Sequence, residues 1–298
     1  MNHTRMPLDK TASDDPTKAI LSIQSEVAYG HVGNSAAVLP LQRLGFEVWP
    51  VNTVQLGHHP GHGSFRGYCV EMERLSAILN AVLDQAPLER CVGMIVGYLG
   101  DAGIAGPVLQ ALDAVIAKRP DLVFLLDPVI GDDGAGVFVR PGVPAAIADE
   151  LLPRAAIITP NRFELAHFSG LEVDDLRQAE LAAERLLKHG PRLVVATGLL
   201  SPGWPGELLM LAVSSEERWL IRTPRLARTF SGTGDAFSAL FLGHFLLAPD
   251  LKTAFERVTS AIFSLAEMTA VRGEDELALV AAQDVLAAPA VRFHAVQP

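Results

Sequence analysis

The sequence is poor in cysteine, in basic residues and in long apolar runs, and each shortage excludes a class of protein. Only two cysteines occur in 298 residues, Cys69 and Cys91, far apart and without Cys-x-x-Cys spacing. Such a count does not suit a disulfide framework of the kind that stabilises small secreted domains. We therefore expect reduced thiols in a cytoplasmic protein, with pairing of these two cysteines left open.

Basic residues number 24 against 34 acidic ones, which leaves a net charge of −10. A negative surface argues against nucleic acid or anionic membranes as main partners. The longest apolar run, residues 236–248, is short and contains His244, so we expect no membrane span. Residues 1–18 are polar and lack the apolar core of a signal peptide, so we expect a disordered lead-in before a single domain at 19–298.

Short apolar segments alternate with amphipathic ones along the chain, which predicts βαβ units and a mostly parallel sheet covered by helices on both faces. The expected strands are residues 19–24, 46–51, 92–96, 122–126, 155–158, 193–196, 208–213 and 217–223. In such sheets ligands bind beyond the carboxyl ends of the strands. Polar side chains follow five of the expected strands: Ser25, Tyr98, Asp127, Thr159 and Thr197.

Residues 229–237, TFSGTGDAF, lie where an expected strand gives way to a helix. The first N–H groups of a helix lack intrahelical partners and attract an anion. Gly232 and Gly234 would let the backbone approach a phosphate, and Thr233 adds a hydroxyl donor. Asp235 would repel phosphate, so its carboxylate is better suited to meet the hydroxyl group of a substrate. This combination predicts a kinase.

The glycine loop does not match two other phosphate-binding motifs. Phe237 stands where a dinucleotide fingerprint would have its third glycine, and no Gly-Lys-Ser/Thr follows as in a Walker A loop. A Gly-x-Gly pair is common, and aspartate is an ordinary helix-capping residue. The loop alone therefore leaves helix capping open as an alternative.

Two further loops leave buried strands with polar side chains, DPVIGDD at residues 127–133 and TPNRFE at 159–164. Each by itself is typical of a turn that caps a helix. Together with the glycine loop they favour a magnesium site, because Mg²⁺ keeps several waters and needs only one or two carboxylates. Asp132 and Glu164 could act on the ion, and Asn161 could donate to phosphate.

Several motifs occur in one order over most of the chain. They are SIQSEVAYGHVGNSAA (22–37), NTVQ (52–55), GYLG (97–100), DPVIGDD (127–133), TPNRFE (159–164), GTGD (232–235) and VAAQDVLAAP (280–289). From Leu21 onward the chain resembles the ribokinase superfamily and, within it, the pyridoxal kinases. The resemblance implies a three-layer αβα sandwich with a mostly parallel central sheet, usually a homodimer. Such enzymes transfer the γ-phosphoryl group of MgATP to the 5′-hydroxymethyl group of pyridoxal, pyridoxine or pyridoxamine.

The resemblance also implies roles for individual residues. Asp235 would be the catalytic base, and Gly232, Thr233 and Gly234 would form the anion hole. It implies Mg²⁺ contacts for Asp132 and Glu164, nucleotide contacts for Asp127, Asn161, Thr197, Gly232 and Gly234, and vitamer contacts for Ser25, Val32, His59, Phe65, Tyr98 and Asp235. A requirement for a monovalent cation is left open.

Residues 52–67 contain four glycines, one proline and three histidines, and we expect a mobile flap over the site there. The family commonly has Ser-Asn-His-Thr in this flap, whereas this chain has Gly57-His58-His59-Pro60, which lacks the threonine hydroxyl. Gly198 likewise stands where a side-chain donor to ATP often lies. We therefore expect a working kinase with weaker vitamer binding. Two alternatives stay open: a kinase for hydroxymethylpyrimidine or a sugar, and a catalytically weak binding protein.

Overall fold

A single sheet of nine strands runs through the part of the chain that the computed structural model describes, residues 17–63 and 66–298. Its order is β11-β10-β9-β8-β5-β4-β1-β2-β3. The strands are β1 (Ala19–Tyr29), β2 (Glu47–His58), β3 (Gly67–Cys69), β4 (Cys91–Val96), β5 (Val123–Leu126), β8 (Ile157–Ile158), β9 (Leu193–Leu199), β10 (Glu207–Ser214) and β11 (Arg218–Pro224). All neighbours from β9 to β2 are parallel, while β3, β10 and β11 pair in antiparallel fashion. The predicted mostly parallel sheet is confirmed.

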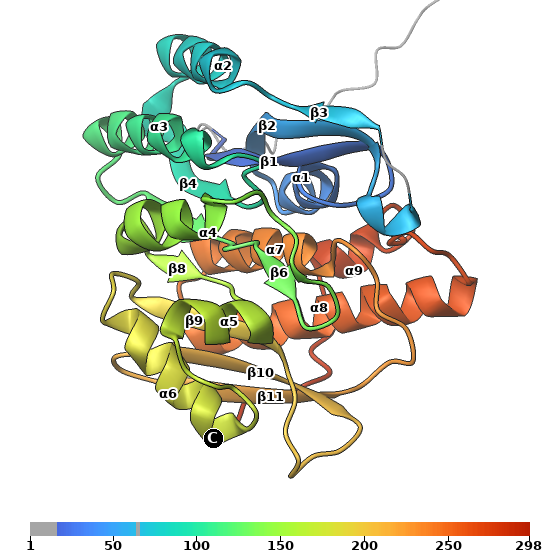
Figure 1. The fold of residues 1–298 in the computed structure, drawn as a ribbon. Helices are drawn as coiled ribbons and strands as arrows, with labels where there is room; N and C mark the ends of the chain where they lie inside the picture. Colours follow the sequence, from blue (N-terminus) through green and yellow to red (C-terminus); the bar gives the residue numbers. More distant parts are fainter. Residues whose placement is uncertain (1–16, 64–65) are drawn as a thin grey trace, which may run out of the picture.

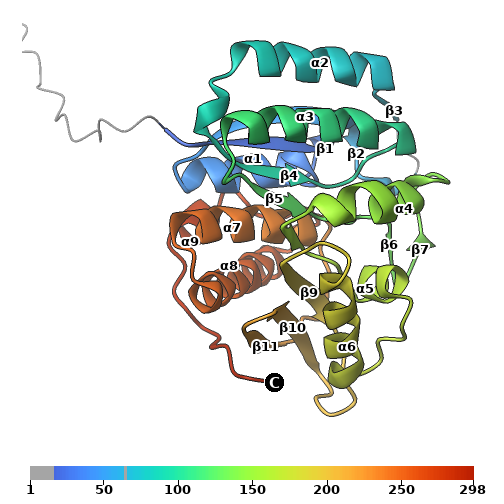
Figure 2. The ribbon, with the colours of Figure 1, turned by 90° about the vertical axis from the view of Figure 1, so that its left-hand side faces the viewer.

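Helices cover both faces of this sheet (Figures 1 and 2). One layer contains α2 (Met72–Gln85), α3 (Ala105–Lys118), α4 (Val143–Ala146), α5 (Arg162–Ser169) and α6 (Leu176–Leu187). The other contains α1 (Asn34–Arg43), α7 (Thr233–Leu247), α8 (Leu251–Arg272) and α9 (Gln283–Ala287). A two-stranded hairpin, β6 (Gly131–Asp132) and β7 (Gly136–Val137), lies outside the main sheet. The predicted αβα sandwich is confirmed, and none of the described helices is long and apolar enough to cross a membrane.

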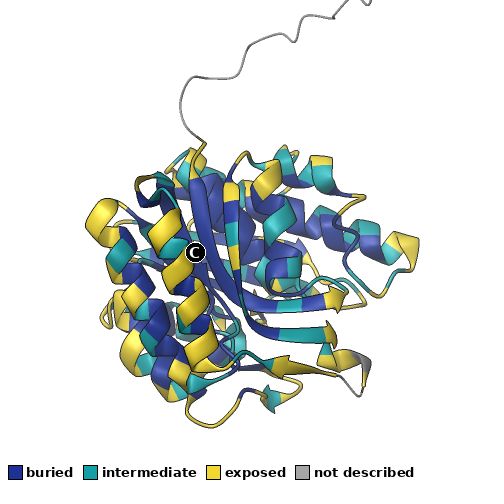
Figure 3. Cartoon of the chain, turned by 90° about the horizontal axis from the view of Figure 1, so that it is seen from above, coloured by how far each residue is buried: buried dark blue, intermediate teal, exposed yellow. Residues whose placement is uncertain are grey.

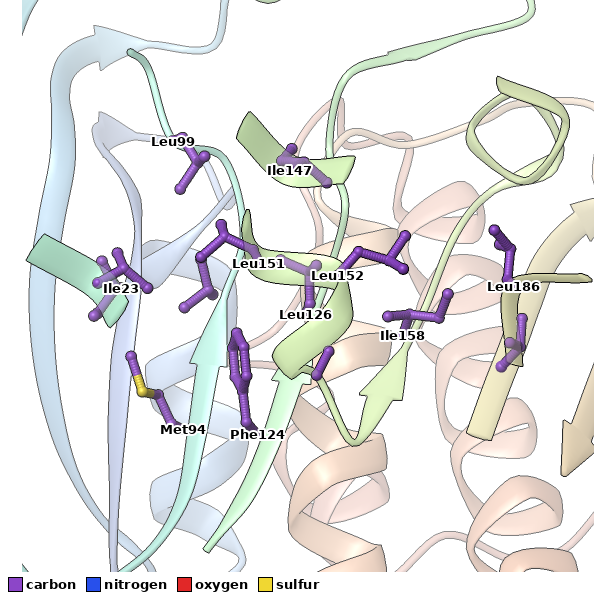
Figure 4. Close-up of a cluster of buried hydrophobic side chains, with 14 of the residues drawn as sticks. Ile23, Met94, Leu99, Phe124, Leu126, Ile147, Leu151, Leu152, Ile158 and Leu186 are labelled. Atoms are coloured by element: carbon purple, nitrogen blue, oxygen red, sulfur yellow. The ribbon is translucent and has the colours of Figure 1, made fainter. Parts of the chain in front are cut away.

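Two apolar cores result from the alternation of side chains along the strands. In β1, Leu21 and Ile23 pack into the core beneath α2, α3 and α6, whereas Ile20 packs into the core beneath α1, α7 and α8. Figure 4 shows the first core, with Ile23, Phe124 and other side chains from neighbouring strands. Seen from above, the buried strands lie between helices whose outer faces are exposed (Figure 3).

Helix α7 is enclosed by the sheet, α1 and α8, and most of its residues are apolar on every side. Nine consecutive residues, from Ala236 to His244, are buried, as expected of a helix without a solvent face. It crosses the sheet at Gly93, where an added Cβ would come within 2.8 Å of Leu246 Cδ1. This close packing fixes the first turn of α7 relative to the strand ends.

The segment expected to form a loop from residue 52 differs from that expectation in its first half. Strand β2 continues to His58, pairing with β1 as far as Tyr29 and with β3 through Val54, Gln55 and Leu56. Strand β1 likewise extends beyond Gln24, where a loop was expected. Hydrogen bonds to a strand on each side keep β2 extended despite Gly57 and His58 at its end. The part of the expected flap that lies outside the strands is the link between β2 and β3, and its mobility stays a prediction. Of the lead-in expected at 1–18, residues 1–16 lie outside the described residues, whereas Thr17 O accepts from Arg90 Nε at 2.7 Å and Lys18 O accepts from Glu47 N at 2.9 Å.

Candidate active site

The glycine loop ends at the first turn of α7, as predicted. Gly232 is the N-cap residue, with φ of 82° in the left-handed region, and its carbonyl accepts a hydrogen bond from Ala236 N at 2.9 Å. Thr233 Oγ1 donates to Phe230 O at 2.9 Å. The first N–H groups of a helix have no acceptor within it. The start of α7 thus presents backbone N–H groups suited to an anion, and Asp235 lies in the same turn.

The loop between β1 and α1 packs directly against this anion site. An added Cβ on Gly232 would lie 1.7 Å from His31 O, and one on Gly33 would lie 2.3 Å from Ser25 Oγ. The Gly33 N–H also hydrogen-bonds to the Asp235 carboxylate. Ser25 and Val32, which the resemblance implies for the vitamer, are both buried here. The structure therefore brings the implied vitamer side and the implied catalytic base together.

Three carboxylates gather near the carboxyl ends of the strands: Asp127, Glu164 and Asp235. Burial raises the pKa of Asp127 well above its usual range, and the charges of Glu164 and Asp235 raise it further. Burial also raises the pKa of Glu164 to about 8, against the opposing effect of backbone N–H donors. Burial raises the pKa of Asp235 as well, against the opposing effect of backbone N–H donors. The site is thus strongly negative when all three groups are charged.

Asp127 is tied to α7 by hydroxyl groups. Ser238 Oγ donates to Asp127 Oδ2 at 3.0 Å, and Thr159 Oγ1 lies 2.8 Å from Ser238 Oγ. All three side chains are buried. Asp127 and Thr159 were expected at this sheet edge from the sequence, whereas Ser238 was not. Its position three residues after Asp235, on the same face of a helix, is the signal that could have found it.

Asn161 and Glu164 form a capping box at the start of α5. Asn161 Oδ1 accepts from Glu164 N at 2.9 Å, and Glu164 Oε2 accepts from Asn161 N at 2.9 Å. Glu164 Oε1 accepts from Ile130 N at 3.0 Å, and Asn161 Nδ2 donates to Gly131 O at 2.8 Å. Helix capping, the alternative left open for this loop, is therefore present. Glu164 Oε1 thus holds the DPVIGDD loop through Ile130, while Oε2 closes the capping box of its own helix.

Asp132 and Thr197 flank this capping box. Asp132 is exposed, and its Oδ1 accepts from Gly134 N at 2.8 Å and from Ala135 N at 2.7 Å within its own turn. Thr197 forms a β-bridge with Asn161 and donates its backbone N–H to Pro160 O at 2.9 Å. Asn161 and Thr197, which the resemblance implies for nucleotide contacts, are therefore partners in a β-bridge.

The donor set fits Mg²⁺ that keeps most of its water ligands. The described residues contain no group of three or more histidine, cysteine or carboxylate side chains able to enclose a metal. The oxygens of Glu164 already accept hydrogen bonds from backbone N–H groups, which suits contact with the ion through water. Magnesium dehydrates reluctantly and takes its remaining ligands from phosphate oxygens. The charge of Asp235 raises the pKa of both Asp127 and Glu164, and a divalent cation would relieve such an environment.

The implied vitamer side is completed by Tyr98 and the flap. The Tyr98 backbone carbonyl accepts from Thr53 Oγ1 at 2.6 Å, and burial raises the pKa of its half-buried phenol. His59 Nδ1 accepts from Gly61 N at 3.0 Å and lies 3.4 Å from Ser231 Oγ. The flap therefore reaches the loop before α7. Phe65 lies outside the described residues.

A mostly parallel αβα sandwich with an anion-binding helix N-terminus, an adjacent aspartate and further carboxylates defines an α/β kinase of the ribokinase type. Residues 62–274 match the model of the phosphomethylpyrimidine kinase family. The pyridoxal kinase PdxY of Rubrobacter xylanophilus is 46% identical over 92% of this chain and 95% of its own. That of Granulibacter bethesdensis is 42% identical, covering 93% and 98%. The chain belongs to the pyridoxal kinase family.

Solved structures agree with this assignment. Pyridoxal kinase from Leishmania donovani in complex with ADP and pyridoxine has a TM-score of 0.87 and 30% identity, covering 94% of this chain and 99% of that one. The crystal structure of pyridoxal kinase from Trypanosoma brucei has a TM-score of 0.82 at the same identity and coverage. The similarity extends over nearly the whole chain.

We predict that Gly232→Ala destabilises the protein and Gly234→Ala does not. The Gly232 substitution places a Cβ against a backbone carbonyl at a positive φ, whereas nothing lies within 4 Å of a Cβ at Gly234. The first should lower the free energy of unfolding by about 2 kcal/mol or more, and the second should leave it within about 1 kcal/mol. Urea unfolding of both variants measures this. Equal stability of the two would contradict the close packing of the loops.

We also predict that Asp127→Asn makes the stability of the protein less dependent on pH. Because folding raises the pKa of Asp127, the folded protein binds protons more tightly than the unfolded chain. Its free energy of unfolding should therefore fall as pH rises above about 4, the ordinary range of an aspartate. The stability of the variant relative to wild type should increase over the same range. Thermal unfolding from pH 5 to 8 tests this, with exposed Asp149→Asn as a control that leaves the slope unchanged.

Proposed function

We propose that this chain phosphorylates the 5′-hydroxymethyl group of pyridoxal, pyridoxine or pyridoxamine, with ATP as the donor. The observation that carries the proposal is the carboxylate of Asp235, which lies in the first turn of α7 and is held by the Gly33 N–H from the implied vitamer side. The names of the relatives support the substrate class. So do the structures of the Leishmania donovani enzyme with ADP and pyridoxine or pyridoxamine.

In the proposed reaction the substrate hydroxyl oxygen forms a bond to the γ-phosphorus while the bond from that phosphorus to the β,γ-bridging oxygen breaks. ADP leaves, and the hydroxyl proton passes to the carboxylate of Asp235. The first N–H groups of α7 donate to the oxygens of the phosphoryl group that is being transferred. Phosphoryl transfer has a loose transition state, so position and charge matter more than base strength. A carboxylate is therefore adequate for this role.

We propose that Asp132 and Glu164 hold Mg²⁺ through water, with Asp127 contributing to the negative potential. The ion, when bound, would neutralise charge on the β- and γ-phosphates. Asn161 retains a second hydrogen on Nδ2 beyond the one given to Gly131 O, and that hydrogen can reach a phosphate. Thr197, its neighbour in the β-bridge, supplies a hydroxyl.

A cytoplasmic homodimer is part of the proposal. Both thiols are free, with Cys91 buried and Cys69 half-buried, which supports a reducing compartment. The homodimer rests on the family resemblance. Pro60, where the family commonly has threonine, is exposed and begins the single helical turn Pro60–His62. Its ring offers no hydroxyl group, so weaker vitamer binding stays a prediction.

A hydroxymethylpyrimidine kinase is the second candidate, because the matching family model is described as phosphomethylpyrimidine kinase. The two candidates differ in substrate but share Asp235 and the anion site. ADP release measured in parallel with pyridoxal, pyridoxamine, hydroxymethylpyrimidine and ribose separates them. We expect turnover with the two B6 vitamers. Turnover with the pyrimidine alone would transfer the proposal to the second candidate.

Asp235→Asn should lower kcat by on the order of 10²-fold or more, the scale of positioned acid–base catalysis. The KM for ATP should change little, because the anion site is built from backbone N–H groups. Steady-state kinetics with the preferred substrate measure both constants. Near-normal turnover in this variant would remove Asp235 from the role of catalytic base.

A further inference from the structure

The loop that follows α8 reaches both of the loops that meet at the anion site. We call residues 273–277 the acidic clamp, because Glu274, Asp275 and Glu276 lie within it. Gly273 ends α8 in the left-handed region, with φ of 67°. Glu274 N donates to Thr269 O at 3.2 Å, and Ala278 N donates to Thr269 Oγ1 at 3.1 Å. The clamp is therefore anchored on both sides to the last turn of α8.

Glu276 holds the loop between β1 and α1. Its Oε2 accepts from His31 N at 2.9 Å, although the two residues are 245 positions apart. An added Cβ on Gly30 would lie 2.3 Å from the same oxygen, so the carboxylate packs directly on the backbone. A hydrogen bond from a backbone N–H to a carboxylate is charge-assisted, and it is stronger than one between neutral groups.

Asp275 holds the other loop, which runs from β11 to α7. It pairs with Arg228 Nη2 at 2.6 Å, and the Arg228 guanidinium lies 5.3 Å from the centre of the Phe230 ring. The ion pair is exposed, with 46% of the arginine side chain and 73% of the aspartate side chain accessible. Exposed pairs contribute little. Of the two acidic contacts, the bond from Glu276 to the backbone is therefore the stronger restraint.

The loop held by Glu276 is the one that contacts the catalytic group. The backbone carbonyl of His31 packs on Gly232. Two residues later, the Gly33 N–H hydrogen-bonds to the Asp235 carboxylate. The side chain of Leu277, in the clamp itself, comes within 3.4 Å of a Cβ placed on Gly232. A short, continuous path thus joins Glu276 to the orientation of Asp235.

We propose that Glu276 is a positioning residue of the phosphoryl-transfer site: by fixing the backbone of His31 it sets the Gly33 N–H against the Asp235 carboxylate. Glu276 acts through the loop and does not itself meet the substrate. Loss of its bond frees the loop to shift and leaves Asp235 less well oriented toward the substrate hydroxyl. The nucleotide contacts proposed for Asn161 and Thr197 lie on other elements and stay in place. The proposal rests on Asp235 as the catalytic base.

The test compares Glu276→Ala, Glu276→Gln and Glu274→Ala. Glu274 is a matched control, because it lies in the same loop but pairs with Arg272 at 2.6 Å on its own helix end. We expect Glu276→Ala to lower kcat on the order of tenfold, with the KM for ATP within about twofold, since small misplacements of a reacting group are costly. Glu276→Gln, whose side-chain oxygen still accepts from His31 N, should recover most of the loss. Glu274→Ala should match wild type.

A second readout does not depend on which substrate is used. Amide hydrogen exchange in the peptide that covers residues 30–35 should be faster in Glu276→Ala than in wild type, and unchanged in Glu274→Ala. A wild-type kcat near zero with every B6 vitamer would overturn the proposed function, but the difference in amide exchange at residues 30–35 would remain. Normal exchange and normal kcat in Glu276→Ala would overturn the positioning role. A lower kcat accompanied by an equal loss in Glu274→Ala would also overturn it, because the effect would then belong to the loop as a whole.

Discussion

Three carboxylates near one helix N-terminus are the constraint on which the rest of the site depends: those of Asp127 and Glu164 are buried, and that of Asp235 is partly buried. Asp127, Glu164 and Asp235 are placed by separate elements of the sandwich, and burial raises the pKa of each. Charges held this close are unfavourable unless donors or a cation oppose them. Backbone N–H groups oppose part of this cost for Glu164 and Asp235. The remainder is the unfavourable charge that the proposed divalent cation would relieve.

The position of α7 links this charge arrangement to the packing of the fold. Its enclosed body contacts β4 at Gly93, and its first turn presents Asp235 next to the β1–α1 loop. Ser238, one turn further on, ties Asp127 to the same helix. The apolar packing around α7 therefore determines how the charged groups are spaced at the sheet edge. Apolar packing and catalytic geometry are properties of one helix.

The sequence predicted the architecture because it depends on local patterns. Alternating apolar segments indicated the parallel sheet, and Asp127, directly after β5, indicated the sheet edge at which the carboxylates lie. The end of β2 was not predictable from its glycines and histidines, since its pairing with β1 and β3 is a long-range event. Glu276 was missed for a similar reason: its partner, His31, lies 245 positions away. Contacts of this kind follow from the assembled layers and not from spacing along the chain.

A comparison of nucleotide binding with and without magnesium tests directly whether the three carboxylates govern the site. ATP alone brings about four negative charges to a cluster of carboxylates, whereas MgATP carries a net charge of about −2, so we predict that nucleotide binding depends strongly on the metal. The rise in the thermal unfolding midpoint should be several-fold larger with ATP and Mg²⁺ than with ATP and EDTA at the same nucleotide concentration. Equal stabilisation under the two conditions would contradict the view that the three carboxylates govern the site.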